Sequence, residues 1–155
     1  MTRKKETKIV ILGSYNSGKT TTLENLCDKK TKIEYNGTTI ALDYGNIKID
    51  GEKVHIFGSP GQERFEFMRE ILSKGLDGAI LVIDSQKGVT SIDEGILNNL
   101  NQMDVPYVVF ANKQDLNPET QFEGLDSAVH VVPTIATQCK GVKDGLNLLY
   151  GMIKN

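Results

Sequence analysis

Cysteine is scarce in this chain of 155 residues, which contains only Cys27 and Cys139. The two cysteines do not have metal-ligand spacing, and so few thiols indicate a reducing compartment. An excess of charge is also missing, because the formal net charge is only -2 at pH 7. Without a basic field, the sequence does not indicate binding to nucleic acid or to an anionic lipid surface.

Long apolar runs are absent as well, and none approaches the length that would span a membrane. The first residues do not resemble a signal peptide, Thr2 is not the glycine that myristoylation needs, and the final Met-Ile-Lys-Asn lacks a prenylation cysteine. We therefore expect a cytoplasmic protein with no direct membrane anchor. Residues 1–7 are predicted to be a flexible N-terminus, and residues 8–155 to form one domain.

Short apolar runs that are rich in β-branched residues recur along the chain: KIVIL, KVHIF, GAILVID, YVVFAN and HVVPT. Such runs are typical of strands buried on both faces of a parallel sheet. Helical spacing of apolar residues lies between them, with Ile92, Ile96, Leu97 and Leu100 expected on one face of a helix. Alternation around Asp50-Gly51 predicts one antiparallel hairpin. The fold class is therefore α/β, a doubly wound, mostly parallel sheet with an antiparallel edge strand.

The first strand leads into GSYNSGKT, from Gly13 to Thr20, which matches the phosphate-loop pattern G-x-x-x-x-G-K-[ST]. Backbone N–H groups from Asn16 to Thr21 are expected to surround a phosphate at a helix N-terminus. This assigns Asn16, Ser17, Gly18 and Thr21 to the nucleotide site. Lys19 would reach the β- and γ-phosphates and act in catalysis, and the Thr20 hydroxyl would ligate Mg²⁺.

A second motif, Asn112-Lys113-Gln114-Asp115, ends a later strand and matches N-K-x-D. The Asp115 carboxylate can accept hydrogen bonds from N1–H and the 2-amino group of guanine, whereas adenine offers neither donor. Lys113 can lay its apolar stem along the base. Asn112 is expected to tie this loop to the phosphate loop. A P-loop ATPase is disfavoured by Asp115.

A third stretch, SPGQERF, is typical of a nucleotide-responsive switch. The N–H of Gly61 can bond to a γ-phosphate, and Gln62 can orient the attacking water. The three loops in this order resemble the small GTPases of the Ras superfamily. TTIALDYG and FGSPGQERF are similar to a prokaryotic branch related to the MglA-type and Arf-type GTPases.

The resemblance implies the fold of a P-loop NTPase G domain, with a six-stranded sheet and one antiparallel edge strand. It also implies Mg²⁺ with GTP or GDP as cofactors, a backbone contact from Ala136 to the guanine oxygen, and effector and GAP-type partners that include a roadblock-type regulator. The switch threonine would be Thr39, binding Mg²⁺ and the γ-phosphate, with Thr38 as the alternative. His55 and His130 have no ligand partners nearby and are interpreted as structural.

The sequence departs from the resembled pattern at Gly58, where an aspartate that helps to hold Mg²⁺ is expected. Asp43 is the candidate replacement, because the predicted hairpin brings its strand beside Gly58. Four residues of strand span roughly 13 Å, so Asp43 and Thr39 cannot both touch one ion, and Asp43 is expected to act through a magnesium-bound water. The alternative is a solvated edge-strand carboxylate that discourages pairing between sheets.

These motifs predict a guanine-nucleotide-dependent switch that binds Mg-GTP and Mg-GDP and hydrolyses GTP slowly. No arginine stands just before the switch threonine, and Arg64 and Arg69 are interpreted as surface residues of the second switch. The alternative function is a GTP-sensing scaffold with negligible hydrolysis, which Gly58 and the missing arginine both favour.

Overall fold

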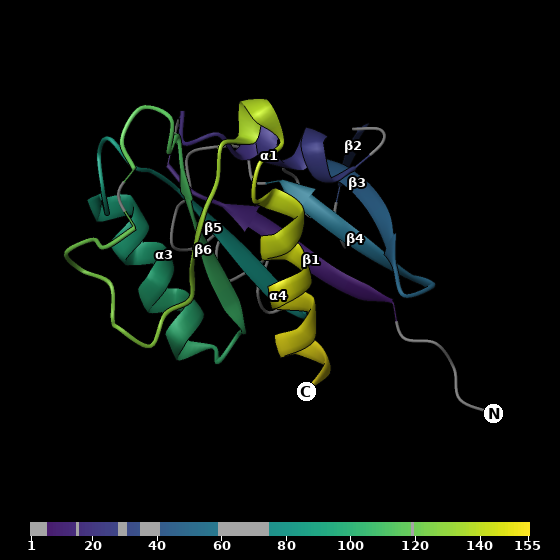
Figure 1. Cartoon of the computed structure of the whole chain (residues 1–155). Helices are drawn as coiled ribbons and strands as arrows, with labels where there is room; N and C mark the ends of the chain where they lie inside the picture. The colour runs from purple at the N-terminus through teal and green to yellow at the C-terminus, as the bar shows by residue number, and fades with distance from the viewer. Residues whose placement is uncertain (1–5, 15, 28–30, 35–40, 59–74, 119) are drawn as a thin grey trace.

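The computed structural model of the chain describes residues 6–14, 16–27, 31–34, 41–58, 75–118 and 120–155 (Figure 1). Its sheet contains the strands β1 (Thr7–Leu12), β2 (Thr31–Glu34), β3 (Ala41–Ile49), β4 (Glu52–Gly58), β5 (Gly78–Asp84), β6 (Tyr107–Asn112) and β7 (Val131–Pro133). The strand order is β2-β3-β4-β1-β5-β6-β7. The helices are α1 (Lys19–Leu26), α3 (Ser91–Gln102) and α4 (Val142–Lys154), together with the short 3-10 helix η1 (Ala136–Gln138).

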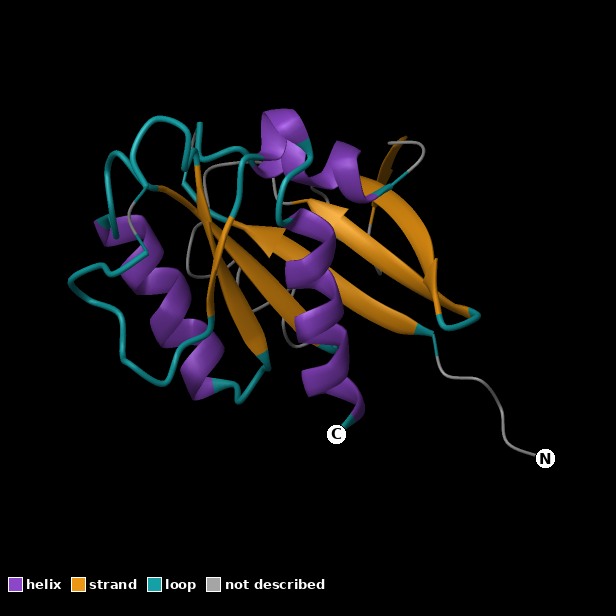
Figure 2. Cartoon of the chain, in the orientation of Figure 1, coloured by secondary structure: helices purple, strands orange, loops and turns teal. Residues whose placement is uncertain are grey.

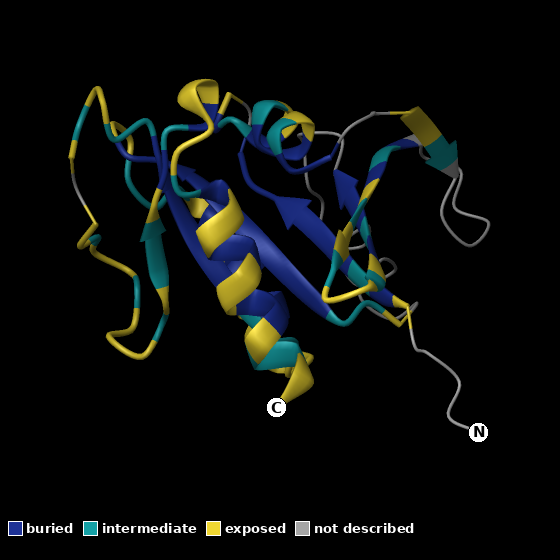
Figure 3. Ribbon diagram, turned by 45° about the vertical axis from the view of Figure 1, so that its right-hand side comes forward, coloured by how far each residue is buried: buried dark blue, intermediate teal, exposed yellow. Residues whose placement is uncertain are grey.

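Helices cover both faces of this sheet (Figure 2). Side chains of α1 and α4 pack with one set of strand residues into a first apolar cluster, and those of α3 pack with the alternate set into a second. Every residue of β5 is buried, whereas the outward side of α4 is exposed (Figure 3). The doubly wound α/β architecture that the apolar runs predict is confirmed.

Within the described residues the sheet has seven strands, where six were expected. The additional strand is β2, whose four residues pair antiparallel with β3 from Thr31↔Tyr44 to Glu34↔Ala41. β3 also pairs antiparallel with β4, so the antiparallel strand lies one position inside the edge of the sheet. β2 shows no apolar run because it is an edge strand, with exposed side chains at Thr31 and Lys32.

The predicted hairpin at Asp50-Gly51 is confirmed. Both residues have positive φ angles, 51° and 78°, as a two-residue type I′ connection requires. The turn sets the register of β3 on β4 from Ile49↔Glu52 to Asp43↔Gly58. This register places Asp43 directly opposite Gly58 at the end of the ladder farthest from the turn.

Two sequence expectations need correction. Thr7, expected in the flexible N-terminus, is the first residue of β1 and is buried. Ile92, expected on the buried face of its helix, is 42% exposed, whereas Ile96, Leu97 and Leu100 are buried. Ile92 lies in the first turn of α3, where Asp93 is the buried residue instead. Among the described residues, none of the helices combines the length and the hydropathy that a membrane crossing needs.

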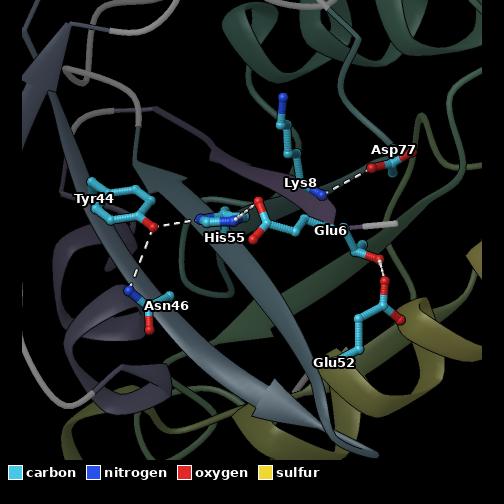
Figure 4. A network of polar contacts seen from close by, with 8 residues as sticks. Glu6, Lys8, Tyr44, Asn46, Glu52, His55 and Asp77 are labelled. Atoms are coloured by element: carbon cyan, nitrogen blue, oxygen red, sulfur yellow. Dashed lines mark hydrogen bonds and ion pairs between the residues drawn. The ribbon is translucent and has the colours of Figure 1, made fainter. Parts of the chain in front are cut away.

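His55 belongs to a polar network on the outer strands (Figure 4). Its Nε2 lies 2.9 Å from Glu6 Oε2, and its Nδ1 is hydrogen-bonded to the Tyr44 hydroxyl. The Tyr44 ring also stacks on the His55 ring, with centroids 5.7 Å apart. The structure therefore supports the interpretation of His55 as a structural residue.

Glu52 joins the start of β4 to β1 and to the C-terminal helix. Its carboxylate accepts hydrogen bonds from Thr7 Oγ1 at 3.0 Å, from Lys154 Nζ at 3.0 Å and from the Tyr150 hydroxyl. The bonds from Lys154 and Tyr150 lower the pKa of Glu52 from 4.5 to about 2. The same contact with Glu52 raises the pKa of Tyr150 to about 12.

Glu52→Gln is expected to lower the free energy of unfolding at pH 7 by about 1–2 kcal/mol, since it removes the charge from these hydrogen bonds. Because the folded-state pKa of Glu52 is depressed, its contribution is complete above pH 4.5 and is lost as the pH falls towards about 2. Urea denaturation of both proteins between pH 7 and pH 3 measures the difference. The exposed Glu123→Gln is the control, and a Glu52→Gln deficit that does not shrink in acid contradicts this account.

Candidate nucleotide-binding site

The phosphate-loop residues connect β1 to α1. Gly13 and Gly18 have φ angles of 151° and 107°, and Asn16 has a φ of 63°. A Cβ atom at Gly13 would lie 2.4 Å from the Val82 carbonyl oxygen, so only glycine fits this turn. Gly18 is the N-cap of α1 and supplies no side-chain cap. The first N–H groups of α1 are therefore available to an anion.

Lys19 is the first residue of α1 and its side chain returns over the loop. The residue is only 8% exposed, and its Nζ donates a hydrogen bond to the Gly13 carbonyl oxygen at 2.6 Å. A buried ammonium group held in this way carries a fixed positive charge at the mouth of the loop. This is the arrangement that a phosphate-binding lysine needs.

Asn112 connects the end of β6 to two other loops. Its Nδ2 donates to the Ser17 carbonyl oxygen at 2.9 Å, which confirms the expected tie to the phosphate loop. Its Oδ1 accepts from Thr134 Oγ1 and from the Ala136 backbone N–H, both at 3.0 Å. The Ala136 N–H, expected to contact a guanine oxygen, is thus directed to Asn112 in this structure.

Thr134 was missed by the sequence analysis. It is 1% exposed, and its hydroxyl binds Asn112 from a strand end that pairs with β6. The sequence signal was its place two residues before Ala136. Thr134 stands directly before Ile135, and its buried hydroxyl takes part in the network.

Asp84 is a second residue that the sequence analysis missed. It ends β5 directly opposite Asn112, and its Oδ2 lies 2.9 Å from Lys113 Nζ. Lys113 has a φ of 65°, and the ion pair holds its ammonium group at the end of β5. A carboxylate at the end of an apolar run was the available signal in the sequence.

Asn25 links α1 to the loop around η1. Its Nδ2 donates to the Ala136 carbonyl oxygen, and its Oδ1 accepts a hydrogen bond from Cys139 Sγ at 3.0 Å. No motif marks Asn25 in the sequence. The Asn25 side chain therefore joins α1 to the loop around Ala136, which we call the base-side loop. Asn112 makes a second connection to this loop.

These loops surround a cavity of about 560 Å³ at the carboxyl ends of the strands. Such a volume is within the usual range for a small-molecule site, and this edge is where open α/β sheets bind ligands. All the predicted site residues in the described part of the chain line the cavity except Gly13: Asn16, Ser17, Gly18, Lys19, Thr20, Thr21, Asp43, Asn112, Lys113, Asp115 and Ala136. Thr39, Gly61 and Gln62 lie outside the described residues, as do Thr38, Arg64 and Arg69.

The residues around the cavity also fit Mg²⁺. No group of three or more histidine, cysteine or acidic side chains that could hold a metal occurs among the described residues. Mg²⁺ does not need such a group, because it commonly keeps several waters and binds one or two protein oxygens together with substrate phosphates. Thr20 and Asp43 supply a hydroxyl and a carboxylate in the same cavity.

Together, the doubly wound sheet, the phosphate loop and the base motif define a P-loop GTPase domain. The chain belongs to the family described as 50S ribosome-binding GTPase, which residues 8–113 match. An uncharacterized protein of Methanocaldococcus jannaschii is 50% identical over 114 residues, which cover 74% of each chain. Translation initiation factor IF-2 of Mycoplasma mobile is 29% identical over 136 residues, or 86% of this chain but only 22% of that protein.

Solved structures share the same fold. The G domain of the T. maritima FeoB iron transporter has a TM-score of 0.72 at 20% identity, and the match covers 97% of this chain and 100% of that one. The FeoB cytosolic domain in a GDP form has a TM-score of 0.78 at 19% identity, with 99% of this chain and 66% of that one covered. At these identities the likeness concerns the fold alone.

Proposed function

We propose that this chain is a guanine-nucleotide-dependent switch that binds GDP and GTP with Mg²⁺ and hydrolyses GTP slowly. The observation that carries the proposal is the position of Asn112, which binds the phosphate loop through Ser17 and the base-side loop through Ala136. Residues of both motifs line one cavity. A ligand that satisfies both has phosphates at one end and a guanine base at the other.

The residues of the phosphate loop and of the base motif have specific roles in this proposal. The N–H groups from Asn16 to Thr21 would hold the α- and β-phosphates, and Lys19 would reach the β- and γ-phosphates. Asp115 would accept from the guanine edge while Lys113 covers the ring. Thr20 would ligate Mg²⁺, which when bound neutralises charge on the phosphate oxygens.

The switching part of the proposal rests on sequence. Thr39 and Gly61 would bind the γ-phosphate and release it on hydrolysis, which would change the surface offered to partners. The TTIALDYG and FGSPGQERF stretches support the narrower MglA-related and Arf-related assignment, and with it effector and GAP-type partners such as a roadblock-type regulator. That assignment is an analogy between families.

Intrinsic hydrolysis is expected on the order of 10⁻⁴–10⁻² s⁻¹, because an arginine finger worth about 10³–10⁵ in rate is not evident in the sequence. Gln62→Leu should lower the rate by a further factor of about 10–100, since the attacking water loses its orienting partner. Chromatography of the co-purified nucleotide, followed by single-turnover hydrolysis of both proteins, measures this. Turnover near 1 s⁻¹ in the wild type, or no loss in Gln62→Leu, contradicts the proposal.

A GTP-sensing scaffold is the second candidate, and Gly58 favours it. Position 58 adjoins the cavity but offers no carboxylate to a metal. Bound GTP that persists through incubation with Mg²⁺ would support the scaffold, whereas conversion to GDP supports the switch. Co-purified ATP would contradict both.

A further inference from the structure

Three residues form a row across the outer strands of the sheet. Asp43 on β3 is paired with Lys32 on β2 and with Gly58 on β4. Directly paired residues in antiparallel strands point to the same face of the sheet. A Cβ atom at Gly58 would lie 3.3 Å from Asp43 Cβ and 3.4 Å from Leu23 Cδ2 on α1. The row therefore faces α1, the helix that begins with the phosphate-binding lysine.

Because both distances are short, a side chain at position 58 would crowd Asp43 and Leu23. A carboxylate there would compete with the Asp43 carboxylate for the same corner of the cavity. The Asp43 side chain is only 15% exposed, and Asp43 lines the cavity, as do Thr20 and Gly58. The Asp43 carboxylate on β3 thus supplies a negative charge next to Gly58 on β4.

Lys32 is the cation that pairs with this carboxylate in the structure. Its Nζ lies 3.0 Å from Asp43 Oδ1, and its side chain is 70% exposed. An exposed lysine contributes little to such a pair, because its flexible stem and its hydration oppose the fixed geometry. A divalent cation held by phosphates at the same corner can displace it at small cost.

We propose that Asp43 takes the place of the carboxylate missing at Gly58 and holds Mg²⁺ through a bound water, and that Lys32 competes with the metal for that carboxylate. The inference rests on the proposed function, because the metal would enter with the nucleotide. Removal of the Lys32 side chain should therefore strengthen the Mg²⁺-dependent retention of GDP, whereas loss of the Asp43 carboxylate should weaken it.

The experiment measures the rate at which fluorescent GDP is released from the full chain, once in excess Mg²⁺ and once in excess chelator. A titration then gives the half-effective Mg²⁺ concentration, at which Mg²⁺ slows GDP release by half of its full effect. The readout is the ratio of the two release rates. Asp43→Asn should reduce this ratio by about 10–100-fold, the usual effect of losing a partner that holds a metal-bound water. Lys32→Ala should lower the half-effective Mg²⁺ concentration. Asp104→Asn, which alters an exposed carboxylate before β6, should change neither value.

The outcomes separate the alternatives. If Asp43 merely holds the edge strand through Lys32, Asp43→Asn and Lys32→Ala will reduce the ratio alike, and that result overturns the proposal. An unchanged ratio in Asp43→Asn also overturns it. The double variant Asp43→Ala with Gly58→Asp should recover part of the ratio. A wild type that retains no GDP, with or without Mg²⁺, would instead contradict the proposed function.

Discussion

Asp115→Asn should reverse the base preference of this protein and favour xanthine over guanine nucleotides. The substitution replaces an acceptor with an amide whose NH₂ group can donate to the 2-carbonyl of xanthine. Guanine would lose two hydrogen bonds to a charged group, each worth about 1.5–3 kcal/mol, so its affinity should fall by about 10²–10⁴-fold. Competition between GDP, XDP and ADP for the wild type and the variant measures the change.

The position of Asp115 makes the result interpretable. Asp115 is exposed in a turn after β6 and lines the cavity, so the substitution disturbs no buried packing. The turn itself is held by the backbone N–H groups of Leu116 and Asn117, which donate to the Lys113 carbonyl oxygen at 2.9 and 3.1 Å. Asp104→Asn makes the same chemical change elsewhere and should retain guanine preference. Unchanged preference in Asp115→Asn would remove the basis for the guanine assignment.

Gly18→Ala is expected to cost about 10²–10³-fold in GDP affinity. A Cβ atom at Gly18 would lie 2.1 Å from Asn112 Nδ2, so the Asn112 side chain would have to move. That side chain binds Ser17, Thr134 and Ala136. Loss of buried hydrogen bonds worth about 1–3 kcal/mol each corresponds to a change of this size. Isothermal titration with GDP, together with thermal unfolding, measures affinity and stability separately.

Gly124→Ala is the matched control for backbone strain. Gly124 has a φ of 91°, but the nearest atoms to its added Cβ are 3.6 Å away or more. It should lose about 1–2 kcal/mol of stability from the left-handed backbone and bind GDP normally. If folded Gly18→Ala also binds GDP like the wild type, the Asn112 connection does not position the nucleotide loops.

Much of the candidate site could be predicted from local patterns in the sequence. GSYNSGKT, Asn112-Lys113-Gln114-Asp115 and the Asp50-Gly51 turn each act through residues close together in the chain. The turn alone set the ladder that brings Asp43 opposite Gly58, because each step along one strand of a hairpin fixes a partner on the other. The fold class could also be predicted, because strands that alternate with helices along the chain are typical of a doubly wound α/β sheet.

The tertiary structure alone decided which distant side chains complete these loops. β2 has four residues and no apolar run, so its pairing with β3, and the contact of Lys32 with Asp43, could not be predicted. Asp84 on β5 pairs with Lys113, and the Thr134 hydroxyl binds Asn112. Asn25 on α1 binds Ala136, from which it is 111 residues away in the chain. A hydrogen bond at that separation leaves no periodic trace in the sequence. It depends on the order of strands in the sheet, which is determined by how the buried faces pack together.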